Sequence, residues 1–202
     1  MKRLAIHLIS FLTVFNFGCL GQEKTAEDYY IRGEVRVKNE NYMGALNDFN
    51  KAIEIKPDFS EAYNSRGNLK GAIGDSEGAL KDLDTAITLD KKEEVLYYNR
   101  GLLRGGVKDY KGAINDFSKA IELNSDFEQA YFNRGNAKLN IDDYSGAIQD
   151  FDKAIELNPE NATAYFNRGL AKGDIGDSTG IDDFQIAIKK NPDLLKGVQF
   201  EN

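Results

Sequence analysis

The chain has 202 residues, of which 41% are hydrophobic, and its 33 acidic side chains outnumber its 26 basic ones, giving a net charge of −7. Binding to nucleic-acid phosphates requires a basic face, and the sequence contains no Lys/Arg cluster, so composition argues against a nucleic-acid partner. One cysteine, Cys19, cannot form a disulfide framework, and the one histidine, His7, lies near the N-terminus.

Residues 1–21 have the pattern of a signal peptide. Lys2 and Arg3 precede an apolar run from Leu4 to Phe17, and small residues follow it. A membrane-spanning helix needs roughly 20 apolar residues, and this run is shorter. The pattern therefore predicts an exported chain whose first segment is removed.

Two routes of signal processing remain open. Cys19 lies just after the apolar run, which resembles the lipobox of bacterial lipoproteins, where the cysteine receives lipid; Asn16 and Phe17 depart from that pattern. The alternative is ordinary cleavage after Gly21. The first route implies a periplasmic or membrane-tethered protein with a lipid at Cys19, and the second implies a soluble secreted protein.

A unit of 34 residues repeats along the rest of the chain. After a short linker at residues 22–25, five copies follow one another, and the fifth is one residue short. A short tail or partial cap remains at residues 195–202. Places within a copy are counted below from its first residue, and the copies occupy residues 26–59, 60–93, 94–127, 128–161 and 162–194.

The first half of each copy combines Tyr at place four with Gly at place eight, on the same face of a predicted helix. Glycine inside a helix costs about 1 kcal/mol relative to alanine. Its fivefold recurrence therefore predicts close approach of a neighbouring helix. The glycines are Gly33, Gly67, Gly101, Gly135 and Gly169.

The second half of each copy has the apolar stripe of a second helix. A small residue is followed by an apolar residue four places later and by Ala three places beyond that, as in Ala45, Phe49 and Ala52. The polar residue between the two halves can accept hydrogen bonds from the exposed N–H groups that begin the second helix. These expected caps are Asn41, Asp75, Asp109, Asp143 and Asp177.

These residues resemble the tetratricopeptide repeat (TPR). Its pattern is a large aromatic at place four, Gly at eight, Ala at twenty, an aromatic at twenty-four, Ala at twenty-seven and Pro at thirty-two, as at Pro57, Pro159 and Pro192. The resemblance covers residues 26–194. It implies an all-α solenoid of five repeats, a right-handed superhelix of antiparallel helix pairs, with first helices lining a concave groove and second helices forming the convex side.

Arginine recurs at place seven and aspartate at the place before the second-helix aromatic. This recurrence predicts a structural ion pair, either between the two helices of a repeat or between neighbouring repeats. The alternative is a ladder of unpaired arginines for an anionic ligand. The residues are Arg32, Arg66, Arg100, Arg134 and Arg168, with Asp48, Asp82, Asp116, Asp150 and Asp183.

The resemblance places two rows of first-helix residues in the groove. Aromatic side chains give contact area at low entropic cost and Asn can pair with backbone amides, so the rows suit a peptide. The alternative is that some of the aromatics pack against adjacent repeats. Place five supplies Tyr30, Asn64, Tyr98, Phe132 and Phe166, and place nine supplies Glu34, Asn68, Leu102, Asn136 and Leu170.

The expected function is non-catalytic binding of a protein or peptide in the bacterial envelope, because the exported chain would contain no histidine for acid–base chemistry. No cofactor or metal is expected.

The fifth copy passes directly from Gly180 to Ile181, which predicts that it lacks the small residue at place twenty and begins its second helix with a shifted turn. Because the tail after it is short, the alternative function is a self-assembling scaffold that docks through this incompletely capped end.

Overall fold

The computed structural model describes residues 24–195, and this part of the chain is all helical. Predictions for the signal peptide, for lipidation at Cys19 and for residues 196–202 lie outside the described residues. The helices are α2 (Ala26–Lys38), α3 (Tyr42–Ile55), α4 (Ser60–Ala72), α5 (Ser76–Leu89), α6 (Glu94–Gly106), α7 (Tyr110–Leu123), α8 (Glu128–Leu139), α9 (Tyr144–Leu157), α10 (Ala162–Asp174) and α11 (Gly180–Lys190), followed by a 3-10 turn at Pro192–Leu195.

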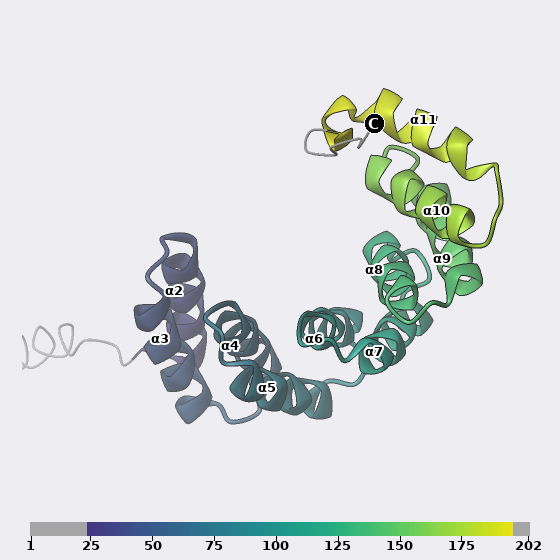
Figure 1. The fold of residues 1–202 in the computed structure, drawn as a ribbon. Coiled ribbons are helices and arrows are strands. Elements are labelled where there is room, and N and C mark those ends of the chain that lie inside the picture. The colour runs from purple at the N-terminus through teal and green to yellow at the C-terminus, as the bar shows by residue number, and fades with distance from the viewer. Residues whose placement is uncertain (1–23, 196–202) are drawn as a thin grey trace, which may run out of the picture.

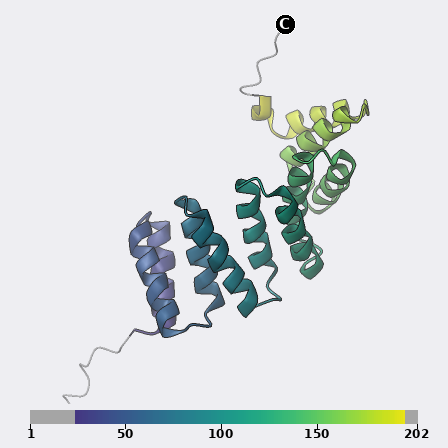
Figure 2. The same ribbon diagram turned by 60° about the horizontal axis from the view of Figure 1, so that its bottom comes forward.

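The helices form five antiparallel pairs, one for each predicted repeat, stacked in an arc. Figure 1 shows the first helices α4, α6, α8 and α10 along the inner side of the arc and the second helices outside them. The two ends of the arc are formed by the pair α2 and α3 and by the pair α10 and α11. Figure 2 shows that successive pairs lie side by side in a row. The predicted all-α solenoid is therefore confirmed.

The caps predicted for the second helices are present in the first four repeats. In each, the Asn or Asp side chain accepts a hydrogen bond of 2.9–3.0 Å from the backbone N–H three residues later. In the fifth repeat the prediction is wrong, because the side chain of Asp177 accepts from the N–H of Thr179, and α11 begins only at Gly180. The one-residue deletion thus lengthens the turn and leaves α11 without a side-chain cap.

The prediction that the fifth repeat lacks a small residue at place twenty is also wrong. Gly180 is buried, and a Cβ added to it would lie 2.7 Å from the carbonyl oxygen of Gly169. Place twenty of the other repeats holds a fully buried alanine. Because the deletion falls in the turn, the register is restored at Gly180, which takes the place of that alanine.

The recurring glycine at place eight makes room for the aromatic ring of the second helix. A Cβ added to Gly101 would lie 2.7 Å from Cε1 of Phe117, and one added to Gly135 would lie 2.8 Å from Cε1 of Phe151. Real Cβ atoms do not approach a ring so closely, so glycine allows the two helices of a repeat to meet. The predicted close approach is confirmed. Because the glycine face of the first helix packs on the second helix, the opposite face of the first helix is directed toward the inner side of the arc.

Candidate functional site

In each repeat, a buried carboxylate of the second helix binds the first helix on the side away from the inner face. Nε and Nη2 of the place-seven arginine donate two hydrogen bonds of 2.5–2.9 Å to the place-twenty-three aspartate. A second cation from the same helix, at place eleven, contacts that aspartate at 2.8–2.9 Å. This second cation was missed in the sequence, although place eleven is basic in every copy: Arg36, Lys70, Arg104, Lys138 and Lys172.

Three of these aspartates, Asp48, Asp82 and Asp183, have lowered pKa values. Burial alone would raise the pKa of Asp82 and of Asp183, but hydrogen bonds from the neighbouring Arg and Lys outweigh burial and lower both pKa values. The pKa of Asp48 is lowered, chiefly by its hydrogen bonds from Arg32. Since the arginines are paired with these carboxylates, the predicted structural ion pair is confirmed and the ladder of unpaired arginines is wrong.

The same arginines also join neighbouring repeats. Their third donor, Nη1, reaches place twenty-five of the preceding repeat at 2.6–3.0 Å. Four junctions have this bond, and the acceptors are Asn50, Asp84, Ser118 and Asp152. These four arginines therefore order both their own helix pair and the junction with the preceding repeat, which holds the inner face in one geometry.

The aromatic residues predicted for the groove at place five pack mainly within the array. The rings of Tyr30, Tyr98, Phe132 and Phe166 are half-buried, with centroids 5.3–6.0 Å from the second-helix phenylalanine of their own repeat. Tyr30 and Tyr98 also contact the last residue of their repeats, Phe59 and Phe127, at 5.1 and 4.8 Å. Burial raises the pKa of both tyrosines. All four aromatics therefore make the packing contacts of the alternative, and binding of a ligand by their exposed parts stays a prediction.

Polar side chains connect neighbouring first helices along the inner face. The amide of Asn99 donates to Asn64 at 2.9 Å, and that of Asn167 donates to Asn136 at 2.7 Å. Asn133 donates to the hydroxyl of Tyr98 at 3.1 Å. Sequence reasoning missed these donors, which lie at place six. Their signal was an Asn at that place in three consecutive copies.

The residues predicted at place nine line hollows between the first helices. Glu34 and Asn68 border a hollow of about 400 Å³ between α2 and α4. Asn68 and Leu102 border one of about 460 Å³ between α4 and α6, and Leu102 and Asn136 border one of about 250 Å³ between α6 and α8. Leu170 is exposed on α10. The two predicted rows thus differ, since the aromatics at place five pack partly within the array and the residues at place nine border the open hollows.

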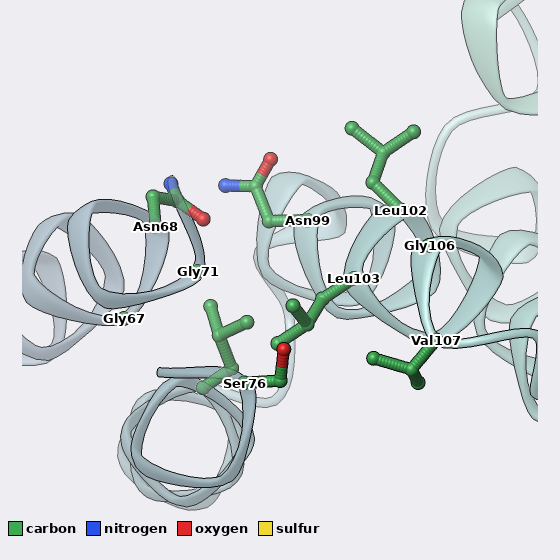
Figure 3. Close-up of a pocket in the computed structure, with 10 residues that line it drawn as sticks. Gly67, Asn68, Gly71, Ser76, Asn99, Leu102, Leu103, Gly106 and Val107 are labelled. Atoms are coloured by element: carbon green, nitrogen blue, oxygen red, sulfur yellow. The ribbon is translucent and has the colours of Figure 1, made fainter. Parts of the chain in front are cut away.

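The largest of these hollows combines amides with apolar walls. Figure 3 shows Asn68 and Asn99 pointing toward each other from α4 and α6, with Leu102 directed to the open side and Leu103 directed inward toward Ser76. Gly67, Gly71 and Gly106 leave space around them because they carry no side chain. The arrangement offers amide donors and acceptors beside a space that an aliphatic side chain can fill. We call the inner face with its three hollows the groove.

Two classes of site were sought in the described part of the chain. Between residues 24 and 195, no group of three or more His, Cys, Asp or Glu side chains is placed to hold a metal ion. Within the same residues, every helix is too short or too polar to serve as a membrane span.

Family models match most of the repeat region. A model described as "TPR repeat" matches residues 33–74, 108–142 and 141–176, and one described as "Tetratricopeptide repeat" matches residues 60–93. No curated protein matches the chain.

Several solved structures share the fold. A crystal structure of MamA protein has a TM-score of 0.77 and 23% identity, covering 90% of this chain and all of that one (100%). YrrB, described as a TPR protein with an unusual peptide-binding site, has a TM-score of 0.73 and 22% identity, covering 83% and 87%. PilF of Pseudomonas aeruginosa has a TM-score of 0.74 and 16% identity, covering 82% and 76%. At these identities the likeness establishes the fold alone.

Proposed function

This chain belongs to the tetratricopeptide repeat family, and we propose that it is a non-catalytic scaffold that binds a segment of another protein in its groove. The observation that carries this proposal is the series of three hollows of about 400, 460 and 250 Å³ between successive first helices. Separate hollows in a row can each receive a side chain of one bound peptide. The fold shared with YrrB, which is described as having a peptide-binding site, supports the same class of partner.

The groove is built for a segment with few charges. Its central part, between α4 and α8, is lined mainly by Asn, Gly and Leu and, among the residues described, by no charged side chain, while the cations of the first helices are held by aspartates on the opposite side. Asn side chains can both donate and accept, so they can bind a peptide backbone running in either direction. The inter-repeat hydrogen bonds order this surface before binding, which lowers the entropic cost of association.

Variants at place nine test the groove without disturbing the packing. We expect Asn68→Ala with Leu102→Ala to weaken binding about tenfold or more, since the two side chains border the largest of the three groove hollows and Leu102 is 42% exposed. The matched control is Leu89→Ala with Asn115→Ala on the convex side, where Leu89 is 41% exposed. Each protein is used to capture partners from an envelope extract, which are identified by mass spectrometry.

The affinity of a captured partner is then measured by titration calorimetry. If the groove variant, folded as judged by circular dichroism, binds with the affinity of the control, the groove assignment is wrong. If neither protein nor the unmodified chain retains any partner, the scaffold function itself is contradicted.

The site of action follows from the N-terminal segment. The chain is exported to the bacterial envelope, either tethered by lipid at Cys19 or released after cleavage near Gly21; the sequence pattern supports both routes. The intact mass of the protein from its producing cells separates the routes. A mass that starts at Cys19 with added acyl chains supports tethering, a mass that starts at Gln22 supports secretion, and an uncleaved chain contradicts export.

A further inference from the structure

The four junctions between repeats share a common set of contacts. Place ten of one repeat packs against places twenty, twenty-one and twenty-four of the preceding repeat, as Ala137 does against Ala113, Ile114 and Phe117. The place-seven arginine donates through Nη1 to place twenty-five. Because the connecting loop is short, the start of each first helix lies beside the end of the preceding second helix. The two ends of the arc each possess one half of this set.

The N-terminal end has the half that a preceding repeat would cover. Val35 stands at place ten of α2 and is 50% exposed, whereas its counterpart Leu69 is 4% exposed. Ile31, one turn earlier, is 60% exposed. Arg32 makes its hydrogen bonds to Asp48 through Nε and Nη2, as the other arginines do with their aspartates. No repeat stands before it in residues 24–195 to take a bond from Nη1.

The C-terminal end has the other half. Ile181 stands at place twenty-one on α11 and is 61% exposed, whereas Leu46, Leu80, Ile114 and Ile148 at that place are half-buried under the next repeat. Gln185 is exposed at place twenty-five, and its side chain has the amide oxygen that an arginine Nη1 requires. The surface next to α11 is therefore shaped for a further first helix.

The two ends carry charges of opposite sign. The first turn of α2 carries Glu27 and Asp28, and the last turn of α11 carries Lys189 and Lys190. Glu27 pairs with Lys56 and Lys190 pairs with Glu160 within the chain. The first turns of α4, α6 and α8 also contain a Glu. No basic residue occupies the last turn of α3, α5, α7 or α9.

Asp28 distinguishes α2 from the later first helices. It stands at place three, which in the later repeats holds the buried residues Ala62, Leu96, Ala130 and Ala164. The carboxylate of Asp28 accepts a hydrogen bond of 2.9 Å from the N–H of Thr25, within the capping box at the start of α2. A junction that covers Asp28 can keep this hydrogen bond, which lowers the cost of burying the charge.

We propose that copies of this chain associate head to tail, with α2 of one copy packed on α11 of the next in the geometry of the internal junctions. Val35 would contact Ile181, and Nη1 of Arg32 would donate to Gln185 of the other copy. The contact joins two different surfaces, so it leaves one free end at each step and can extend into a chain or close into a ring. Assembly continues the groove from one copy to the next.

The test uses one variant for each end. Val35→Lys blocks the N-terminal end and Ile181→Lys blocks the C-terminal end, while Leu89→Lys, at a convex position of 41% exposure, is the control. Mass is measured by sedimentation over a range of concentrations, with circular dichroism to verify folding. We expect the unmodified protein and the control to increase in mass with concentration and each end variant to remain a monomer.

Mixing the two end variants gives the decisive result. The Val35→Lys protein keeps a free α11 and the Ile181→Lys protein keeps a free α2, so an equal mixture should form dimers and nothing larger. Association should also weaken from 0.1 to 1 M salt, where the screening length falls from about 10 to about 3 Å.

Other outcomes overturn the proposal. If only one end variant abolishes association, like ends meet each other, and if the mixture stays monomeric, the two ends do not meet. An unmodified protein that stays monomeric at all concentrations also contradicts head-to-tail association. Failure of this proposal can be distinguished from failure of the proposed function. The mass measurements involve no partner protein, and the groove variant Asn68→Ala with Leu102→Ala, which tests partner binding, changes neither end of the arc.

Discussion

Two glycines of α6 separate the effect of close packing from that of helix propensity. Replacing either Gly101 or Gly105 by Ala favours the helix by about 1 kcal/mol. At Gly101 the new Cβ would lie 2.7 and 2.9 Å from Cε1 and Cδ1 of Phe117, so the ring or the helix must move. At Gly105 the nearest heavy atom is Cβ of Ala113 at 4.0 Å, an ordinary contact. Forcing an extra group into a packed core costs about 1–3 kcal/mol.

The expected result is a difference between the two variants, in which the gain in propensity cancels. Gly105→Ala should match or exceed the stability of the unmodified protein, and Gly101→Ala should be less stable than Gly105→Ala by about 1–3 kcal/mol. Urea unfolding followed by circular dichroism measures this difference, and with a slope of about 1–3 kcal/mol/M it shifts the midpoint by about 1 M. Equal midpoints would refute the argument that the recurring glycine exists to admit the ring.

Three further predictions concern the ion pairs and the inner face. Asp116→Ala leaves two arginine charges without their carboxylate and should lower the free energy of unfolding in urea by about 3–5 kcal/mol. Removing the exposed Glu122 should lower it by under about 1 kcal/mol. Equal costs would contradict a structural role for the buried pair. The folded-state pKa values of Asp82 and Asp183 lie below the ordinary 3.8. Their contribution to folding stability is therefore complete above about pH 4 and is lost as the pH falls through the lowered values. A thermal melting point that falls instead between pH 8 and pH 5 would contradict this prediction. Phe132→Ala should lower stability by about 2–4 kcal/mol because the ring packs on Phe151, and an unchanged urea midpoint would return Phe132 to the groove.

The period of the sequence by itself determined most of the fold. Helix starts at Asn41 and Asp109, helix ends before Pro57, and the close approach at Gly135 are local or recurrent features, and each is decided by a few neighbouring residues. The pairing of Arg100 with its aspartate was also readable, since two opposite charges that recur at fixed places have few partners within reach. The choice between a bond in the repeat and one between repeats was not readable, and the arginine makes both.

The deletion in the fifth repeat could be located only in three dimensions. In the sequence, the missing residue could be assigned either to the turn or to the start of the second helix, because both alignments preserve the surrounding pattern. The carbonyl of Gly169 lies where any side chain at the crossing would clash, so Gly180 takes the crossing point and Asp177 loses its capping role.

The division of the groove residues was likewise decided by tertiary structure. Aromatic side chains suit a binding surface and an interior equally well, so residue type does not separate Phe132 from a ligand-binding ring. What separates them is the neighbouring helix, which covers place five and leaves place nine open at Asn68 and Leu102. Sequence therefore determined which helices form and how they repeat, while the packing of one repeat on the next determined which of their side chains remain on the open inner face.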